Sequence, residues 1–189
     1  MTNTASHSRL FTLLNVVELL SIVFVLTMAM VLQIRLHELP CPLCLLQRAG
    51  LLGICVGLLL NIRFQPRPVH YTLVLLSAVF SACVALRHIA LHVVPGTGAY
   101  GSPVFDFHLY TWVFIISMIV ITYTAIILGC SAQYQAQPST NHCCWKKGIT
   151  HLCFLLVFAT ALANTVSTYL ECGFKECPEN PVVYLKLNG

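Results

Sequence analysis

Charge is what this 189-residue chain has least of. Asp, Glu, Lys and Arg together make up only 8% of the residues, whereas hydrophobic residues make up 58%. Because soluble domains carry about 25% charged residues, this composition predicts an integral membrane protein. The net charge of +4 is small and dispersed, without a run of basic residues of the kind that follows a nucleic-acid backbone. We therefore expect no nucleic-acid partner.

Long linkers and repeats of fixed period are also missing, so we expect a single membrane domain over residues 1–189. Five segments are long enough to cross a bilayer as helices, which takes roughly 20 apolar residues. None shows the two-residue alternation of a transmembrane strand, which predicts an all-α helical bundle. The first segment lacks a small-residue cleavage site and is expected to be retained. The expected spans are residues 11–33, 43–62, 70–93, 109–130 and 149–169.

Basic residues fall on one side of these five spans. Arg9 precedes the first, Arg63 and Arg67 lie between the second and third, and Lys146 and Lys147 lie between the fourth and fifth. The positive-inside rule then predicts a cytoplasmic N-terminus and an outer C-terminal tail of residues 170–189.

This orientation sorts the ten cysteines. Cys41 and Cys44 lie at the outer end of the second span, and Cys172 and Cys177 lie in the outer tail. Both pairs would face a compartment where disulfides persist, such as a bacterial periplasm. Four others are expected to be small apolar fillers of the bundle: Cys55, Cys83, Cys130 and Cys153.

The segment Cys41-Pro42-Leu43-Cys44 carries the chemistry. Proline suits the first turn of a helix, so the second helix is expected to begin beside Cys41. The free N–H groups and the dipole of a helix start favour an anion there, which lowers the pKa of a thiol and makes it reactive. Cys44 is within disulfide reach, and the pair predicts thiol–disulfide exchange. A stapling disulfide and a metal site remain alternatives.

Arg48 follows Cys44 by four residues, on the same helix face and deeper in the membrane. A charge at that depth is costly and usually functional, so Arg48 is a candidate donor to the polar head of a ligand. The alternative is an arginine whose head group reaches the interface. Arg87, His88 and His92 end the third span on the same side, either as interfacial polar residues or, for the two histidines, as haem or metal ligands.

The ten residues from Leu39 to Arg48, LPCPLCLLQR, resemble the bacterial disulfide bond formation protein B family, DsbB. The resemblance implies a four-helix core, here with a fifth helix added. It implies that Cys41 and Cys44 form a redox disulfide that a membrane quinone, ubiquinone or menaquinone, reoxidises. Cys44 would face the quinone and Arg48 would help to hold it. Further candidates for quinone contact are Gln47, Arg87, His88 and His92.

The chain departs from the family pattern in one place. Such proteins usually carry a second cysteine pair in the outer loop between helices 3 and 4, but residues 94–108 contain no cysteine. We expect Cys172 and Cys177 to do the work of the missing pair, unless they only staple the tail.

The sequence thus predicts a quinone-dependent protein-disulfide oxidoreductase of the bacterial inner membrane. It would reoxidise a DsbA-like periplasmic thiol oxidase and pass the electrons to the quinone pool, supporting disulfide bond formation. No resident metal is expected. Two alternatives remain: a structural membrane subunit with stapling disulfides, and a metal site built from all four outer cysteines.

Overall fold

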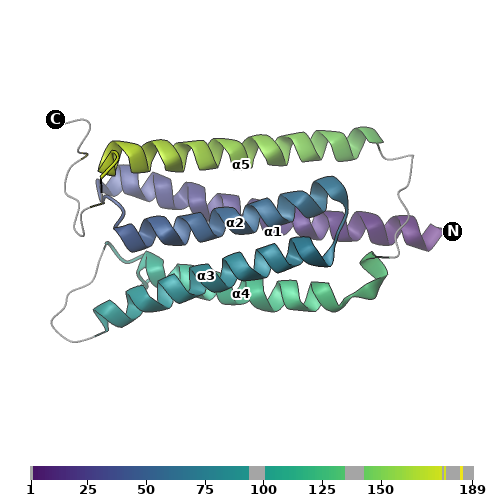
Figure 1. The fold of residues 1–189 in the computed structure, drawn as a ribbon, viewed down its shortest axis with the longest axis horizontal. Helices are drawn as coiled ribbons and strands as arrows, with labels where there is room; N and C mark the ends of the chain where they lie inside the picture. Colours follow the sequence, from purple (N-terminus) through teal and green to yellow (C-terminus); the bar gives the residue numbers. More distant parts are fainter. Residues whose placement is uncertain (1, 94–100, 135–142, 176, 178–183, 185–189) are drawn as a thin grey trace.

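The computed structural model describes residues 2–93, 101–134, 143–175, 177 and 184. Within them, five long helices and one short 3-10 helix make up the fold (Figure 1), with an isolated bridge between Val104 and Phe107 as the only extended pairing. All five long helices are apolar enough to cross a membrane, so the predicted all-α membrane bundle is confirmed. The elements are α1 (Thr2–Leu36), α2 (Pro42–Phe64), α3 (Pro68–His92), α4 (Leu109–Gly129), η1 (Ser131–Gln133) and α5 (Cys143–Cys172).

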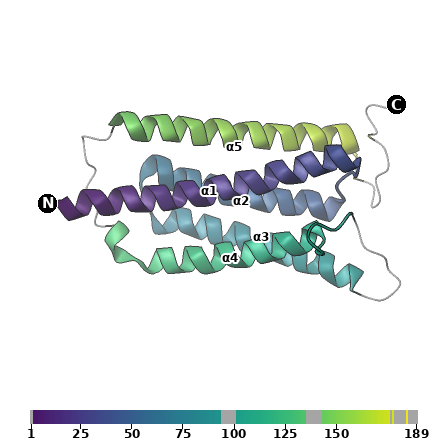
Figure 2. The same cartoon turned by 180° about the vertical axis from the view of Figure 1, so that it is seen from behind.

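The bundle is arranged around α2. This helix packs against α1, α3 and α5, and α4 packs mainly against α3. The fifth helix lies along α1 and α2, on the side away from α3 and α4 (Figures 1 and 2). The core combines residues of α1, α2, α3 and α4 with two from α5, Cys153 and Val157. The added helix is therefore packed into the core rather than appended to it.

Three glycines of α2 let α3 approach closely. A Cβ atom on Gly50 would lie 2.9 Å from the Cβ of Ser81, and one on Gly57 would lie 2.6 Å from Cγ2 of Val74. Small residues at a helix interface allow the backbones to come together in a membrane, where packing drives association. This contact fixes the last turns of α3 against the first turns of α2.

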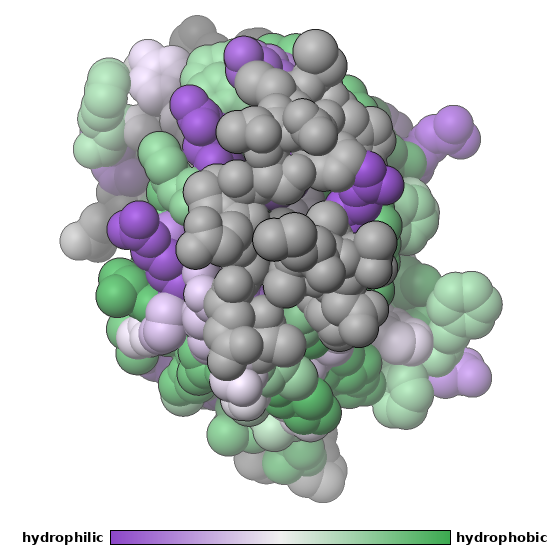
Figure 3. All heavy atoms as spheres, turned by 90° about the vertical axis from the view of Figure 1, so that its right-hand side faces the viewer, coloured by the Kyte–Doolittle hydropathy of each residue, from purple (hydrophilic) through white to green (hydrophobic). Residues whose placement is uncertain are grey.

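The two ends of the bundle differ. We call one the cysteine end, because it holds Cys41, Cys44 and Cys172; there α1 and α5 finish and α2 starts. The chain begins at the opposite end, the N-terminal end. Figure 3 looks onto the N-terminal end, where hydrophilic side chains stand among the hydrophobic ones that cover the flanks. The predicted cytoplasmic placement of this end stays a prediction.

Candidate functional site

Cys41 caps the start of α2. Its backbone is extended (φ −70°, ψ 163°), Pro42 opens the helix, and the backbone N–H of Cys44 donates to the Cys41 Sγ atom at 3.2 Å. The two sulfur atoms lie 2.7 Å apart. The predicted helix start beside Cys41 is thus confirmed, and the pair is poised to open and close as a disulfide.

Cys41 is set up as a thiolate. The side chain of Cys44 donates to its sulfur, and this contact is the main reason why the pKa of Cys41 falls from the ordinary 9.0 to about 5. Burial opposes the shift, while His88 and the backbone N–H of Cys44 reinforce it. At neutral pH a reduced Cys41 therefore carries a negative charge, the reactive form of a thiol.

His88 is the third member of this cluster. It is buried on α3, with its Nε2 atom 3.8 Å from the Cys41 Sγ atom. The Nε2 atom of Gln47 lies 3.4 Å from Nδ1 of the same ring. Gln47 and His88 are both predicted quinone-contacting residues; in the structure Gln47 lines the cavity below Cys44, and His88 lies beside the sulfur of Cys41.

The other two predicted residues of α3 lie farther from the cysteine pair. His92 is half-buried, and its ring stacks on Tyr110 with 5.8 Å between centroids. Arg87 is exposed. Of the described residues that line the cavity below Cys44, none comes from α3.

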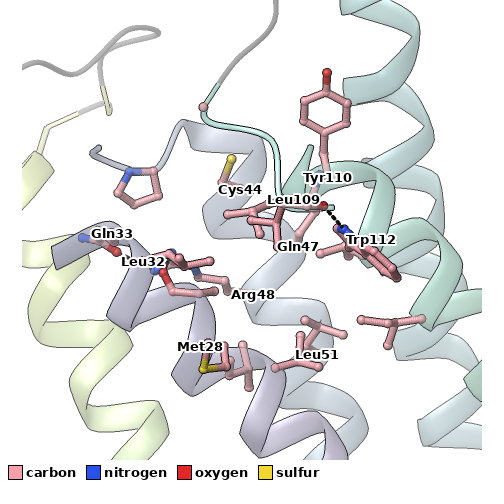
Figure 4. A pocket seen from close by; sticks show the side chains of 18 of the residues that line it. Met28, Leu32, Gln33, Cys44, Gln47, Arg48, Leu51, Leu109, Tyr110 and Trp112 are labelled. Carbon is pink, nitrogen blue, oxygen red and sulfur yellow. Dashed lines mark hydrogen bonds between the residues drawn. The ribbon is translucent and has the colours of Figure 1, made fainter. Parts of the chain in front are cut away.

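That cavity has a volume of about 330 Å³ and is lined by residues of α1, α2 and α4 near the cysteine end. Its wall is mostly apolar, with Met28 and Leu51 toward its base and Tyr110 and Trp112 on the α4 side (Figure 4). The loop before α4 closes part of it, held by a 2.8 Å hydrogen bond from the Trp112 Nε1 atom to the carbonyl of Val104. Its polar members include Gln33, Glu38, Cys44, Gln47 and Arg48.

Arg48 reaches into this cavity from α2, as does Gln33 from α1 (Figure 4). It is only 9% exposed, so its guanidinium group is buried among the helices. It donates to the Gln33 Oε1 atom at 2.8 Å, to the carbonyl of Ala29 at 3.3 Å and to the Asn164 Oδ1 atom at 3.5 Å. A buried cation with neutral acceptors retains charge to offer an electron-rich ligand.

The residues that the sequence prediction missed come largely from α5. One face of this helix turns polar toward the cysteine end, and Glu171 is completely buried there. Ser167 accepts a 2.9 Å hydrogen bond from Gln33 Nε2. Alternating spacings of four and three residues in the sequence indicate this buried face, which begins with apolar residues: Cys153, Val157, Thr160, Asn164, Ser167 and Glu171.

The tail cysteines form a disulfide directly after α5. Cys172 and Cys177 are bonded, with 4.8 Å between their Cα atoms. Cys172 is buried at 4% exposure, whereas Cys177 is partly exposed. Farther along the tail, the Tyr184 hydroxyl accepts a 3.0 Å hydrogen bond from Gln33 Nε2. The tail thus contacts Gln33, which lines the cavity and accepts a hydrogen bond from Arg48.

A metal site finds weak support in this arrangement. Cys41, Cys44 and His88 offer ligand atoms within 4.8 Å of one another. Structural zinc sites are almost always four-coordinate, and the proposed partners Cys172 and Cys177 are bonded to each other. The four outer cysteines therefore do not form a tetrathiolate set in this state.

Comparison with known proteins gives a family match. The sequence model of the DsbB family, disulfide bond formation protein DsbB, matches residues 11–102. This range runs from the first part of α1 through α3, and it contains Cys41, Cys44 and Arg48 but neither α4 nor α5. No curated protein and no solved structure matches the chain. With five apolar helices around a paired Cys41 and Cys44, and with this match, residues 11–102 of the chain belong to the DsbB family, whose members are membrane oxidoreductases of disulfide bond formation.

Proposed function

We propose that the chain is a thiol:quinone oxidoreductase that reoxidises a DsbA-like periplasmic dithiol oxidase. One observation carries the proposal: Cys44 and Arg48 line the same apolar cavity, one helical turn apart, beside the partner sulfur of Cys41. A reactive sulfur and a buried cation facing one apolar space suit a ligand with a polar head and a hydrophobic body. A stapling disulfide would need neither the cavity nor the cation.

The cavity fits a membrane quinone. Ligand pockets typically enclose about 300–1,000 Å³, mostly apolar with a few placed polar groups, and the volume of about 330 Å³ suits a quinone ring. A quinone bound there would accept two electrons and two protons. Arg48 and Gln47 would orient its oxygens, and the ring of Tyr110 would bound it on the α4 side. Met28 and the other apolar residues would keep water out.

Electrons would enter through the tail disulfide. A thiolate of the partner attacks the Cys177 Sγ atom, because Cys177 is the more exposed of the two sulfurs. The Cys172–Cys177 bond breaks, and Cys172 leaves as a thiolate. Cys172 then attacks the Cys41 Sγ atom, and Cys44 leaves as a thiolate facing the cavity. The order follows from burial, since Cys172 points into the protein and Cys44 lines the cavity.

Two further exchanges complete the transfer. The partner's second thiolate displaces Cys177 from the mixed disulfide, which gives the oxidised partner. The freed Cys177 attacks Cys172 and displaces Cys41, which restores the tail disulfide. Two electrons have then moved from the partner dithiol to Cys41 and Cys44. The depressed pKa of Cys41 makes it a good leaving group in the last exchange.

Trapping the intermediate between the two pairs tests the relay. In a Cys44→Ser/Cys177→Ser variant, Cys41 and Cys172 have no other outer partner and should form a disulfide with each other under mild oxidation. Such a bond needs Cα atoms within about 7 Å, and peptide mapping without reduction would identify it. A matched Cys41→Ser/Cys177→Ser variant should give much less of the corresponding Cys44–Cys172 bond.

Thiol trapping in intact cells tests quinone dependence. Cys41 and Cys44 should be oxidised in cells that make quinone and should accumulate as dithiols when quinone synthesis is blocked. A pair that stays oxidised without quinone, while the partner also stays oxidised, would return the chain to a structural subunit with stapling disulfides.

A further inference from the structure

Glu171 is the one described carboxylate that is completely buried. Its side chain is 0% exposed, and neither oxygen has a hydrogen-bond partner among the described residues. It lies in the last turn of α5, next to Cys172. An ionised carboxylate in such a place loses its hydration and gains little in return. The negative end of the helix dipole adds to this cost. A neutral, protonated carboxyl is the form that these surroundings favour.

The charged neighbours of Glu171 connect it to the redox site. Arg48 of α2 and Cys41, just ahead of α2, are the titratable groups that interact with it electrostatically. Tyr184 of the tail interacts in turn with Arg48. On α1 the facing polar group is the neutral Gln33, which bonds Ser167 one turn before Glu171. Glu171 therefore lies between the tail disulfide and the cation that lines the cavity.

The redox chemistry leaves one proton unaccounted for. This step rests on the proposed function. Reduction of a quinone consumes two electrons and two protons, and the reduced cysteine pair holds both electrons. It does not hold both protons, because Cys41 is a thiolate at neutral pH and only Cys44 keeps a proton. A second proton has to come from a group close to the pair, since the cavity wall is largely apolar.

We propose that Glu171 is the resident proton donor of the redox site and supplies the second proton of quinone reduction. The Cys41 thiolate, the Cys44 thiol and the Glu171 carboxylic acid give up two electrons and two protons. The products are the Cys41–Cys44 disulfide, the hydroquinone and the Glu171 carboxylate, so the total charge does not change. Arg48 then stabilises the carboxylate until it regains a proton released by the partner's thiols at the tail.

Between Glu171 and the cavity lie polar groups that contact one another, although Glu171 itself has no hydrogen-bond partner among the described residues. Ser167 lies one turn from Glu171 on the same face of α5, and its hydroxyl accepts from Gln33 Nε2 at 2.9 Å. The Tyr184 hydroxyl accepts from the same nitrogen at 3.0 Å. Gln33 itself lines the cavity. Hydroxyl groups can pass a proton by exchanging donor and acceptor roles, so Ser167 and Tyr184 are the candidates to carry it from the carboxyl toward the ligand space.

Infrared spectroscopy of the purified full-length chain, without added quinone, tests the protonation state directly. At neutral pH the spectrum should contain carbonyl intensity from protonated carboxyls, and Glu171→Gln should remove one component of it. Asp106→Asn, the same change at an exposed carboxyl in the loop before α4, should leave it in place. A spectrum in which Glu171→Gln removes only a carboxylate band overturns the inference.

A single-turnover measurement tests the donor role. The pre-reduced chain is mixed with a short-chain ubiquinone, and in parallel with a short-chain menaquinone, and quinone absorbance is followed against pH. The wild-type rate should be nearly flat from about pH 5.5 to pH 6.5, where Glu171 stays protonated. In Glu171→Gln the second proton must come from water, so the rate should fall by about tenfold per pH unit over that range. Glu171→Asp keeps a proton and should keep the flat profile, and it also serves where the glutamine variant fails to fold.

The outcomes distinguish a failure of the proposed function from a failure of the donor role of Glu171. A wild-type chain that reduces neither quinone overturns the proposed function, and the donor role with it. A wild-type chain that reduces quinone, beside a Glu171→Gln variant with the same rate and the same flat profile, overturns the donor role and leaves the oxidoreductase intact.

Discussion

Polar networks lie buried at both ends of this bundle, and they differ in how completely their members are paired. Near the N-terminal end, Asn15 donates to the Tyr71 hydroxyl at 2.9 Å, and Asn61 donates to Asn15 at 3.2 Å. Tyr71 in turn donates to Gln133 at 3.0 Å, which links α1, α2, α3 and η1. Near the cysteine end, among the described residues, Arg48 donates only to neutral acceptors and the Glu171 oxygens have no hydrogen-bond partner, and a cavity opens beside Arg48.

This difference distinguishes a structural network from a functional one. A buried polar group without a partner costs more stability than a paired one returns. The closed network near the N-terminal end fixes helix positions, because each central amide or hydroxyl holds a neighbour. In the open network near the cysteine end, the Arg48 guanidinium and the Glu171 carboxyl are still able to interact with other groups. Thiolates, protons and a ligand would have to be accommodated there. Substitutions at the two ends should therefore affect different quantities.

The largest expected effect is at Cys44. Cys44→Ser removes the sulfur that faces the cavity, so quinone-dependent oxidation of a dithiol should fall to background while the chain still inserts. The rate of quinone absorbance loss under a reduced partner protein measures this. Cys83→Ser, the same change at an exposed cysteine of α3, should leave the rate unchanged. Full turnover by the Cys44 variant would contradict the assignment of the site.

The next effect concerns Arg48. Arg48→Ala removes the cavity's buried cation, and a charged hydrogen bond contributes about 1.5–3 kcal/mol. The apparent KM for quinone should therefore rise about tenfold to a hundredfold, with little change in the KM for the thiol partner. Arg63→Ala, at the far end of α2, is the matched control. An unchanged quinone KM would return Arg48 to a purely structural role.

A smaller effect concerns the pH dependence of Cys41. Its pKa is lowered to about 5, so the thiolate is complete above that value and is lost as the pH falls through it. The ultraviolet absorbance of the thiolate in the reduced chain, minus that of Cys41→Ser, should follow this titration. Because His88 helps to lower the pKa, His88→Ala should move the midpoint upward, whereas His151→Ala at an exposed site should not. A midpoint near the ordinary thiol value in the unaltered chain would contradict this.

The smallest effect belongs to the network near the N-terminal end. Asn15→Ala removes a hydrogen-bond partner from both Tyr71 and Asn61. It should lower the free energy of unfolding by about 1 kcal/mol. The quinone KM should stay at the wild-type value. Thermal unfolding in a lipid-like detergent, followed with the KM on the same preparation, measures both. A raised quinone KM in Asn15→Ala, without a loss of stability, would contradict the assignment of a purely structural role to the network near the N-terminal end.

Much of the cysteine end could be predicted from the sequence, because its chemistry is local. The helix start at Pro42 follows from proline and the apolar run behind it, and the position of Arg48 follows from the helical repeat. The roles of residues on other helices could not be reached in this way. His88 meets Cys41 only because Gly50 and Gly57 let α3 approach α2. The spacing of Asn164, Ser167 and Glu171 indicates a buried face on α5, but it does not indicate that this face packs beside Arg48.

The most direct test of the central claim is the stoichiometry of electron transfer. The purified chain is reconstituted in lipid with a reduced DsbA-like oxidase and a short-chain ubiquinone, and partner disulfides and remaining quinone are counted in the same samples. The account predicts that one quinone disappears for each partner disulfide formed, and that neither change occurs without the chain. Partner oxidation without a matching loss of quinone would contradict it.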